Sequence, residues 1–213
     1  MKDLIIIGAG KFARETVWML ERINEREPEW NILGYADDTP EKQGTQVYGL
    51  PVLGTVDVLL TWPREVWVTM PMGTSPGRRS LVQRLAGASH VHYATLKACS
   101  ALTGKNMKIG EGSLLCEHTL CTVDVTIGRH SIVNVGSTLS HDVVVGDFVT
   151  ISPGVTICGN CVLEDGCFIG AGATIIEQMH IGPGVVVGAG ATVVRSLTQP
   201  GTYVGTPARK LEK

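Results

Sequence analysis

An aliphatic side chain recurs at every sixth position over much of the chain, and this repeat limits the possible folds more than any other feature. The series is Ile109, Leu115, Cys121, Ile127, Val133, Leu139, Val145, Ile151, Ile157, Leu163, Ile169, Ile175, Ile181, Val187 and Val193. Neither a helix of about 3.6 residues per turn nor a strand with a period of about two keeps this phase for so long. The repeat therefore predicts a stacked structure with every sixth side chain pointing inward.

Glycine often follows the aliphatic residue, and the position four after it is usually small or β-branched. A hexad of this form makes one flat side of a three-sided coil, so three hexads close one turn. We therefore predict an all-β parallel solenoid over residues 94–213, in which residues 18 apart stack on one another.

Residues 1–93 follow a different pattern, which predicts an α/β domain. The expected elements are a buried strand at residues 4–7, a Gly8-Ala9-Gly10 turn, a helix carrying residues 16–23, strands at 32–36 and 66–70, and a helix at 78–86. The result is a Rossmann-like βαβ unit, about half of a dinucleotide-binding fold.

Charge and hydropathy exclude several classes of protein. With 18 Lys and Arg against 20 Asp and Glu, the chain has no strongly basic character, so we expect no nucleic-acid partner. No apolar run is long enough for a membrane span. The first residues do not resemble a signal peptide, and the six cysteines are then expected to be reduced thiols in the cytoplasm.

The Gly8-x-Gly10 turn is a candidate phosphate site, because backbone N–H groups at the start of a helix bind anions. Asp37 or Asp38, after the second strand, could reach a ribose or a base. A glycine-rich turn can also serve packing alone. Since no second mononucleotide half fits before the repeat, we favour one nucleotide, such as that of an activated sugar.

His141 is a candidate general base. It occupies the third hexad position, at an outward corner, and Gly159 lies 18 residues further on. Asp142 could hold one nitrogen of the imidazole ring. The alternative is a solvated surface histidine.

An internal duplication suggests a binding groove. Residues 169–175 and 187–193 are offset by 18, which stacks Gly170 on Gly188 and Gly172 on Gly190. An extended ligand could follow such a strip, and the cations Arg209 and Lys210 lie further along the chain. Alternatively, these glycines only form corners.

Several motifs together resemble one family, the sialic-acid O-acetyltransferases and nucleotide-amino-sugar N-acetyltransferases of the NeuD/PglD type. They are Asn134, Ser140-His141-Asp142, Val145-Gly146-Asp147, Ser152-Pro153-Gly154-Val155, Cys158-Gly159-Asn160 and Gly205-Thr206-Pro207-Ala208. The Gly-Ala-Gly turn and the paired aspartates extend the resemblance over nearly the whole chain.

The resemblance implies a left-handed β-helix, a homotrimer, and acetyl-CoA as co-substrate in a groove between subunits. His141 would be the base, Asp142 would orient it, and the Gly159 N–H would stabilise the oxyanion. Asn134 would line the acceptor side. The cofactor side would comprise Gly159, Gly170, Gly172, Gly188, Gly190, Pro207, Arg209 and Lys210, and the nucleotide side Gly8, Gly10, Lys11, Phe12, Asp37 and Asp38.

Two departures from the family pattern stand out. Gly10-Lys11-Phe12-Ala13 occupies the place of the common Gly-Gly-His-Ala, so Lys11 could meet a phosphate instead. Thr150 replaces a second histidine of some members and cannot act as a base.

No metal site is expected, because the histidines lack the spacing of a convergent triad. Cys121, Cys161 and Cys167 fit inward positions as small core residues. Cys158 beside Gly159 leaves open a ping-pong alternative with an acylated thiol.

The sequence is compatible with three functions. The leading hypothesis is direct acetyl transfer from acetyl-CoA to the amine of a nucleotide-linked amino sugar. The alternatives are O-acetylation of a sugar acid and a non-catalytic trimeric nucleotide-binding module.

Overall fold

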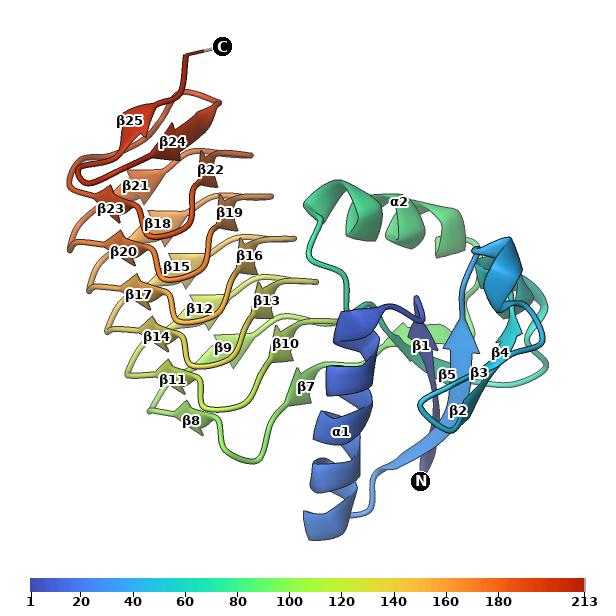
Figure 1. Ribbon diagram of the computed structural model, residues 1–213. Helices are drawn as coiled ribbons and strands as arrows, with labels where there is room; N and C mark the ends of the chain where they lie inside the picture. Colours follow the sequence, from blue (N-terminus) through green and yellow to red (C-terminus); the bar gives the residue numbers. More distant parts are fainter. Residues whose placement is uncertain (213) are drawn as a thin grey trace. The chain divides into compact units, whose positions relative to one another are not determined.

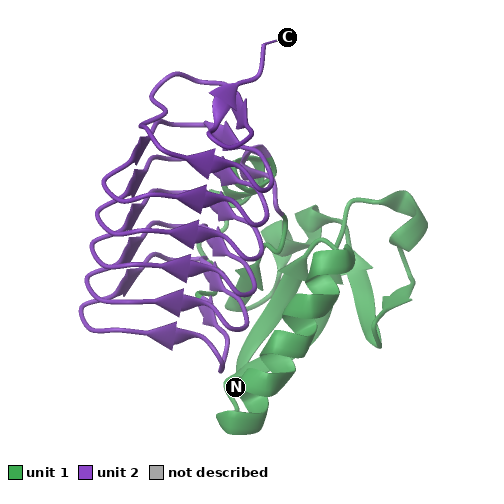
Figure 2. Ribbon diagram, turned by 60° about the vertical axis from the view of Figure 1, so that its left-hand side comes forward, with its two compact units in different colours: residues 1–72, 77–95 green, residues 73–76, 96–213 purple. Residues whose placement is uncertain are grey.

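The computed structural model describes residues 1–212, which form two compact units. The first comprises Met1–Met72 and Gly77–Thr95, and the second comprises Gly73–Pro76 and the chain from Leu96 onward (Figure 2). The first unit is a three-layer α/β domain and the second is a left-handed parallel β-helix, so the predicted fold classes are confirmed. Neither helix of the described chain combines the length and apolar character needed to cross a membrane.

The first unit is built on a six-stranded sheet in the order β3-β4-β2-β1-β5-β6. All neighbours in it are parallel except β3 and β4, which form an antiparallel hairpin. Its elements are β1 Lys2–Ile7, α1 Lys11–Arg26, β2 Trp30–Ala36, the 3-10 helix η1 Pro40–Lys42, β3 Gln46–Val47, β4 Leu50–Gly54, the 3-10 helix η2 Val56–Thr61, β5 Val66–Thr69, α2 Ser75–Leu85 and β6 Val91–Tyr93.

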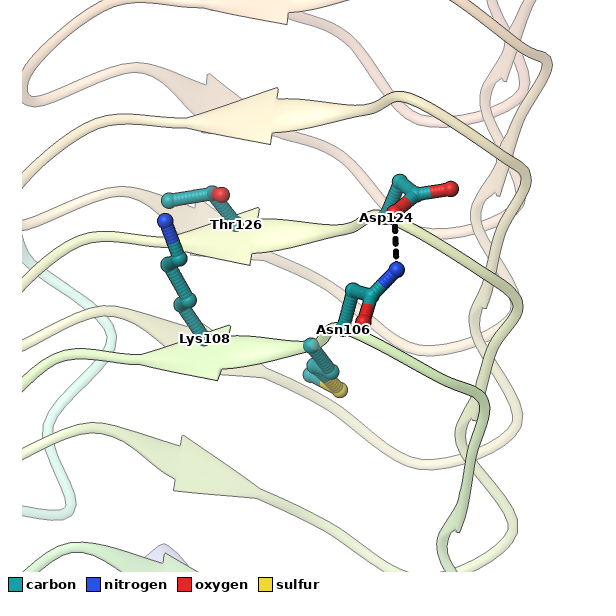
Figure 3. A pocket seen from close by; sticks show the side chains of 5 residues that line it. Asn106, Lys108, Asp124 and Thr126 are labelled. Atoms are coloured by element: carbon teal, nitrogen blue, oxygen red, sulfur yellow. Dashed lines mark hydrogen bonds between the residues drawn. The ribbon is translucent and has the colours of Figure 1, made fainter.

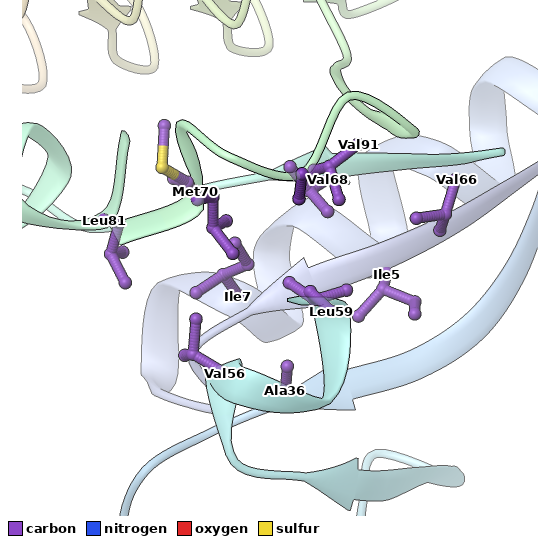
Figure 4. Close-up of a cluster of buried hydrophobic side chains, with 12 residues drawn as sticks. Ile5, Ile7, Ala36, Val56, Leu59, Val66, Val68, Met70, Leu81 and Val91 are labelled. Atoms are coloured by element: carbon purple, nitrogen blue, oxygen red, sulfur yellow. The ribbon is translucent and has the colours of Figure 1, made fainter. Parts of the chain in front are cut away.

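Strand β1 lies at the centre of this sheet and is buried on both faces. Leu4, Ile5, Ile6 and Ile7 are at most 1% exposed, and Ile5 and Ile7 pack in the core with Val68 (Figure 4). Each such side chain stabilises the fold by about 1.5–3 kcal/mol relative to leaving it in water. The carboxyl end of β1 is thereby fixed, and with it the turn that opens α1.

Two local differences from the sequence-based expectations have physical causes. Helix α2 begins at Ser75, before the predicted Arg78, because Pro76 suits the first turn of a helix. The β3–β4 hairpin was not predicted. Its turn residues Tyr48 and Gly49 have φ values of 49° and 76°, a conformation usually signalled by Asn-Gly, so the tyrosine hides the hairpin in the sequence.

The second unit winds through three sheets, one on each side of the coil, whose strands are all parallel except β25, which is antiparallel to β24 (Figure 1). The first face has β7 Leu96–Lys97, β10 Leu114–Leu115, β13 Ile132–Val133, β16 Thr150–Ile151, β19 Phe168–Ile169, β22 Val186–Val187, β24 Thr202–Val204 and β25 Arg209–Lys210. The second face has β8 Leu102–Thr103, β11 Leu120–Cys121, β14 Thr138–Leu139, β17 Thr156–Ile157, β20 Thr174–Ile175 and β23 Thr192–Val193. The third face has β9 Lys108–Ile109, β12 Thr126–Ile127, β15 Val144–Val145, β18 Val162–Leu163 and β21 His180–Ile181.

The strand register confirms the predicted stacking. Leu120 pairs with Thr138, and Thr126 with Val144, so equivalent residues are 18 apart. From Leu115 to Val193, every predicted inward aliphatic residue is at most 1% exposed, whereas Ile109, the first of the series, is only partly buried. The aliphatic column therefore fills the interior of the coil.

One corner of the coil carries a row of residues with left-handed backbone. Asn106, Asp124, Asp142, Asn160 and Gln178, each 18 after the last, have φ values between 58° and 62°. Asn and Asp adopt this conformation more readily than most residues, because their short polar side chains bond locally. The row lies between the second and third faces, and the histidine considered below directly precedes one of its members, Asp142.

Replacement of Gly128 by alanine tests the close approach between coils. A Cβ at this position would lie 2.5 Å from the carbonyl carbon and oxygen of Gly146. We expect Gly128→Ala to lower the free energy of unfolding by about 1–3 kcal/mol, since backbone must move to admit the methyl group. Urea unfolding gives the measurement. Gly87→Ala is the control, because a Cβ there meets nothing within 4 Å; equal effects of the two substitutions would contradict this account.

Candidate functional site

His141 lies at the corner between β14 and β15, directly against the next coil. The Asn160 N–H donates to the His141 carbonyl at 3.0 Å, which fixes the two coils at this point. A Cβ placed on Gly159 would lie 2.5 Å from Cε1 and 2.6 Å from Nε2 of the imidazole. The ring therefore rests on a bare α-carbon, and any larger residue at position 159 would displace it.

Asp142 binds the other nitrogen of the ring. His141 Nδ1 and Asp142 Oδ2 are 2.9 Å apart, and both side chains are about half exposed, at 53% and 54%. An ionised carboxylate only accepts hydrogen bonds, so a neutral imidazole donates from Nδ1 and keeps its lone pair on Nε2. The left-handed backbone of Asp142, with φ of 58°, belongs to the corner row described above.

Gly159 carries a candidate oxyanion donor beside this ring. Its neighbours Cys158 and Asn160 donate their N–H groups to carbonyls of the coils on either side. Among residues 1–212, no acceptor takes the Gly159 N–H. The structure thus brings together His141, Asp142 and Gly159 in an arrangement that can remove a proton and stabilise a developing negative charge.

Asn134 lies elsewhere on the coil. It follows β13 at the corner between the first and second faces, whereas His141 follows β14 at the next corner. Its Oδ1 accepts the Val135 N–H at 2.8 Å, and its own N–H donates to the Ile151 carbonyl at 2.9 Å. Within one chain, the structure does not bring Asn134 to the imidazole.

The four glycines of the predicted groove divide into two kinds. A Cβ on Gly170 would lie 2.5 Å from the Ala189 nitrogen, and one on Gly188 would lie 2.8 Å from Val204 Cγ1, so both positions are needed for coil packing. Gly172 and Gly190 have φ values of 67° and 66° and face open space. The glycines stack as expected, but only Gly172 and Gly190 leave open space on their outer side.

The C-terminal residues form a hairpin at the end of the solenoid. Strand β25 pairs antiparallel with β24, and Arg209 and Lys210 are exposed on it. Successive residues of a strand point to opposite sides, so these two cations do not face one ligand together. Pro207 is exposed at the turn, and the Ala208 N–H donates to the Thr192 carbonyl at 2.7 Å.

The Gly8-Ala9-Gly10 turn is held by Asp37. The Asp37 carboxylate accepts the Ala9 N–H at 2.6 Å and the Thr39 N–H at 2.8 Å, and it pairs with Lys42 at 2.8 Å. Burial alone would raise the pKa of Asp37, but the hydrogen bonds from Lys42, Thr39 and the Ala9 amide outweigh it and hold this pKa well below its ordinary value. The Asp37 carboxylate therefore has a structural role within the first unit, because it holds the turn through these hydrogen bonds.

Asp38 is also engaged inside the first unit. Arg84 donates to its two oxygens at 2.6 and 3.3 Å, and the Val56 N–H donates at 2.9 Å. The hydrogen bond from Arg84 is the main reason that the pKa of Asp38 is lowered. The nucleotide contacts of Asp37 and Asp38 remain predictions, and the sequence did not reveal Lys42 or Arg84 as their partners.

Lys11 and Phe12 begin helix α1, just after the turn. Gly8 has a φ of 89°, which favours glycine, and Gly10 precedes the helix in extended conformation. Lys11 is exposed and Phe12 is half-buried. Lys11 also lines a surface pocket of about 410 Å³ with Arg14, Glu15, Trp18 and Tyr48.

The remaining residues considered in the sequence, three cysteines and Thr150, are buried in the solenoid. Cys121, Cys161 and Cys167 are fully buried, and burial raises the pKa of each thiol, to about 11 for Cys121 and Cys167. Thr150 is buried and its hydroxyl donates to the Gly73 carbonyl at 2.9 Å. In the part of the chain that the structure describes, no three His, Cys, Asp or Glu residues converge in a way that could hold a metal ion.

Comparisons with known proteins match both units. Residues 3–85 match the family model of the PglD N-terminal domain, and residues 160–195 match that of the bacterial transferase hexapeptide repeats. A search of curated proteins found no match.

Solved structures resemble the whole chain. WeeI from Acinetobacter baumannii is 32% identical, with 99% of this chain and 100% of that chain covered and a TM-score of 0.88. The acetyltransferase domain of PglB from Neisseria gonorrhoeae, in complex with acetyl coenzyme A, is 30% identical, with 99% of both chains covered and a TM-score of 0.87. PerB from Caulobacter crescentus, in complex with CoA and GDP-perosamine, is 23% identical, with 100% of this chain and 98% of that chain covered and a TM-score of 0.82; this likeness shows the fold.

Asp37 makes stability depend on pH in a defined direction. Its folded pKa lies below the ordinary value of 3.8, so its contribution is complete above about pH 5 and is lost as the pH falls toward the folded pKa. We expect Asp37→Asn to cost about 1–3 kcal/mol at pH 7, because buried donors lose a charged acceptor, and less at pH 3.

Urea unfolding at pH 7, 5 and 3 measures this difference. Glu41→Gln, which changes an exposed carboxylate on η1, is the matched control. A deficit for Asp37→Asn that stays constant across the three pH values would contradict the assignment.

Proposed function

The chain belongs to the NeuD/PglD-type family of hexapeptide-repeat acyltransferases, and from this premise we propose that it transfers acetyl from acetyl-CoA directly to the amine of a nucleotide-linked amino sugar. The arrangement of His141, Asp142 and Gly159 is the observation that carries the proposal. The acetyl-CoA complex of the PglB domain supports the choice of co-substrate.

His141 would act as the general base. As the amine nitrogen attacks the thioester carbonyl carbon, His141 Nε2 takes a proton from that nitrogen. The carbonyl oxygen becomes an oxyanion, which the Gly159 N–H would stabilise. When the carbon–sulfur bond breaks, the imidazolium returns its proton to the leaving thiolate, so the products are the amide and free CoA.

Asp142 would position the base. Its carboxylate at 2.9 Å from Nδ1 selects the tautomer with the lone pair on Nε2 and stabilises the imidazolium that forms. Because both side chains are about half exposed, solvent weakens the purely electrostatic part of this pairing. Orientation is therefore the larger contribution.

Acetyl-CoA would bind along the coils that follow Gly159. We assign the pantetheine to the open turns at Gly172 and Gly190, with Gly170 and Gly188 permitting the close stacking of those coils. Pro207 would border this path, and Arg209 or Lys210 would meet the phosphates. The Gly8-Ala9-Gly10 turn with Lys11 and Phe12 would bind the nucleotide of the acceptor, and Asp37, which accepts the Ala9 N–H, would also keep that turn in shape. Asp37 or Asp38 would reach the ribose or the base.

We propose a homotrimer, which the position of Asn134 supports. Because Asn134 and His141 occupy different corners of one chain, an acceptor that touches both needs the Asn134 corner of a second copy beside the His141 corner of the first. Threefold association repeats this contact at each corner pair and closes the assembly. The groove between copies would then hold acetyl-CoA and the amine.

Loss of the imidazole tests the catalytic proposal. We expect His141→Ala to reduce CoA thiol release at least about 100-fold, because a positioned base contributes about 10²–10⁴ to the rate. Thermal stability and assembly mass should be unchanged, since the ring is exposed. The assay is a thiol-release screen over amino sugars on UDP, GDP, dTDP and CMP carriers.

The outcomes separate the competing functions. Undiminished thiol release in His141→Ala would reject the mechanism. Nucleotide binding by the wild type without any thiol release would indicate a binding module. An acetylated product that hydroxide cleaves would be an ester and would indicate O-acetylation, whereas an amide survives.

Removal of the charge at Asp142 tests its positioning role. We expect Asp142→Asn to lower kcat about 10-fold or more and to change the pH profile of kcat, because the amide can donate to Nδ1 and favour the wrong tautomer. A variant with wild-type kcat and pH profile would leave Asp142 without this role.

A further inference from the structure

We propose that a polar pocket on the first two coils, lined by Asn106, Met107, Lys108, Asp124 and Thr126, binds the sugar ring of the acceptor. The assignment rests on the proposed function and adds a specificity subsite to it. The pocket has a volume of about 550 Å³ and opens on the third face, across β9 and β12 (Figure 3).

The pocket lies next to the candidate base along the axis of the solenoid. Asp124 and Asp142 belong to the same corner row, and the Asp142 N–H donates to the Val123 carbonyl at 3.2 Å. Equivalent strands of adjacent coils are hydrogen-bonded neighbours, so their backbones lie about 4.8 Å apart. Asp124 is one coil from the His141–Asp142 pair and Asn106 is two coils from it.

The pocket and the residues assigned to acetyl-CoA lie on opposite sides of His141 along the solenoid axis. Gly159 and the other residues assigned to acetyl-CoA all follow His141 in the chain, so they lie on its own coil or on later coils. The pocket lies on the earlier coils. With the acceptor amine at Nε2 of His141 and the thioester at Gly159, the earlier coils stay free of acetyl-CoA and can take the sugar ring, while Asn134 of a second copy would line another side of it.

The side chains in the pocket suit a polyol. Asn106 Nδ2 donates to Asp124 Oδ1 at 2.8 Å, which fixes the amide and leaves its oxygen and the second carboxylate oxygen outside this bond (Figure 3). Lys108 supplies donors, and the Thr126 hydroxyl can donate or accept. A sugar ring presents hydroxyls of both kinds, so this mixture fits it.

An anionic ligand fits the same pocket poorly. Its one cation, Lys108, is balanced by the Asp124 carboxylate, whereas a phosphate site gathers several cations or backbone N–H groups. Val123, which is 42% exposed directly before Asp124, adds an apolar surface for the carbon face of a pyranose. The pocket therefore favours the neutral sugar over the diphosphate of the acceptor.

Coil packing accounts for only part of this cluster. Asn106 and Asp124 have left-handed backbone and bond to each other, so both would stand at this corner without any ligand. Lys108 and Thr126 are partners across β9 and β12 and project outward from the coil. No corner requires them, which makes them the residues to substitute.

The test compares Lys108→Met and Thr126→Val with the wild-type protein. The acceptor is the nucleotide-linked amino sugar that gives the highest kcat/KM in the screen over UDP, GDP, dTDP and CMP carriers. We expect the KM for this acceptor to rise about 5-fold or more in each variant, with kcat within 2-fold and the KM for acetyl-CoA unchanged, because uniform binding of the sugar is lost. Lys97→Met is the matched control, a lysine of the same coil on the first face, and should retain all three constants.

Each other result counts against the assignment in a distinguishable way. A wild type that turns over, with an unchanged acceptor KM in both variants, would overturn the subsite alone. A changed assembly mass in Lys108→Met would identify the pocket as a contact between copies and would overturn the subsite too. No thiol release by the wild type with any acceptor would overturn the proposed function and this assignment with it.

Discussion

Backbone hydrogen bonds between successive coils are the interaction on which the rest of the structure depends. The Leu120 N–H donates to Ser137, the Ser140 N–H to Ile157 and the Cys158 N–H to Ile175, so each coil is fixed to the next at the same spacing. These bonds convert a distance of 18 residues in sequence into one strand spacing in space. The candidate base, its oxyanion donor and the polar pocket owe their separations to this ladder rather than to contacts of their own.

The corner conformations adapt this regular ladder to chemistry. At Asp142 a left-handed backbone both turns the chain and delivers a carboxylate to the histidine before it. At Gly159 the absence of a side chain lets the imidazole rest on the following coil. A residue type that tolerates the turn and one that lacks a side chain therefore place His141 in the proposed catalytic corner of an otherwise repetitive scaffold.

The solenoid could be predicted in detail because its period is visible in the residues themselves, and the stacking of His141 beside Gly159 follows from arithmetic. The first unit was less accessible. Tyr48 concealed a tight hairpin, and the sequence gives no sign that Lys42 and Arg84 occupy the paired aspartates. The reason for the difference is physical. In the solenoid the same contacts recur in every coil, whereas the partners of Asp37 and Asp38 depend on how segments distant in the sequence come together. The stacking of Lys108 on Thr126 follows from the same arithmetic, because they are 18 residues apart. The polar pocket was missed because no sequence motif marks these residues as ligand-binding.

The bare turns at Gly172 and Gly190 have a further consequence for the evolution of this scaffold. Each coil bonds only to its immediate neighbours, so gain or loss of one complete 18-residue turn beyond Gly159 would leave both cut ends able to rejoin in register. Such an event would lengthen or shorten the path available to an extended thioester by a single increment of about 4.8 Å, without disturbing the reactive corner. Relatives built on this plan can thus be sorted by the number of rungs that separate their histidine from the end of the stack.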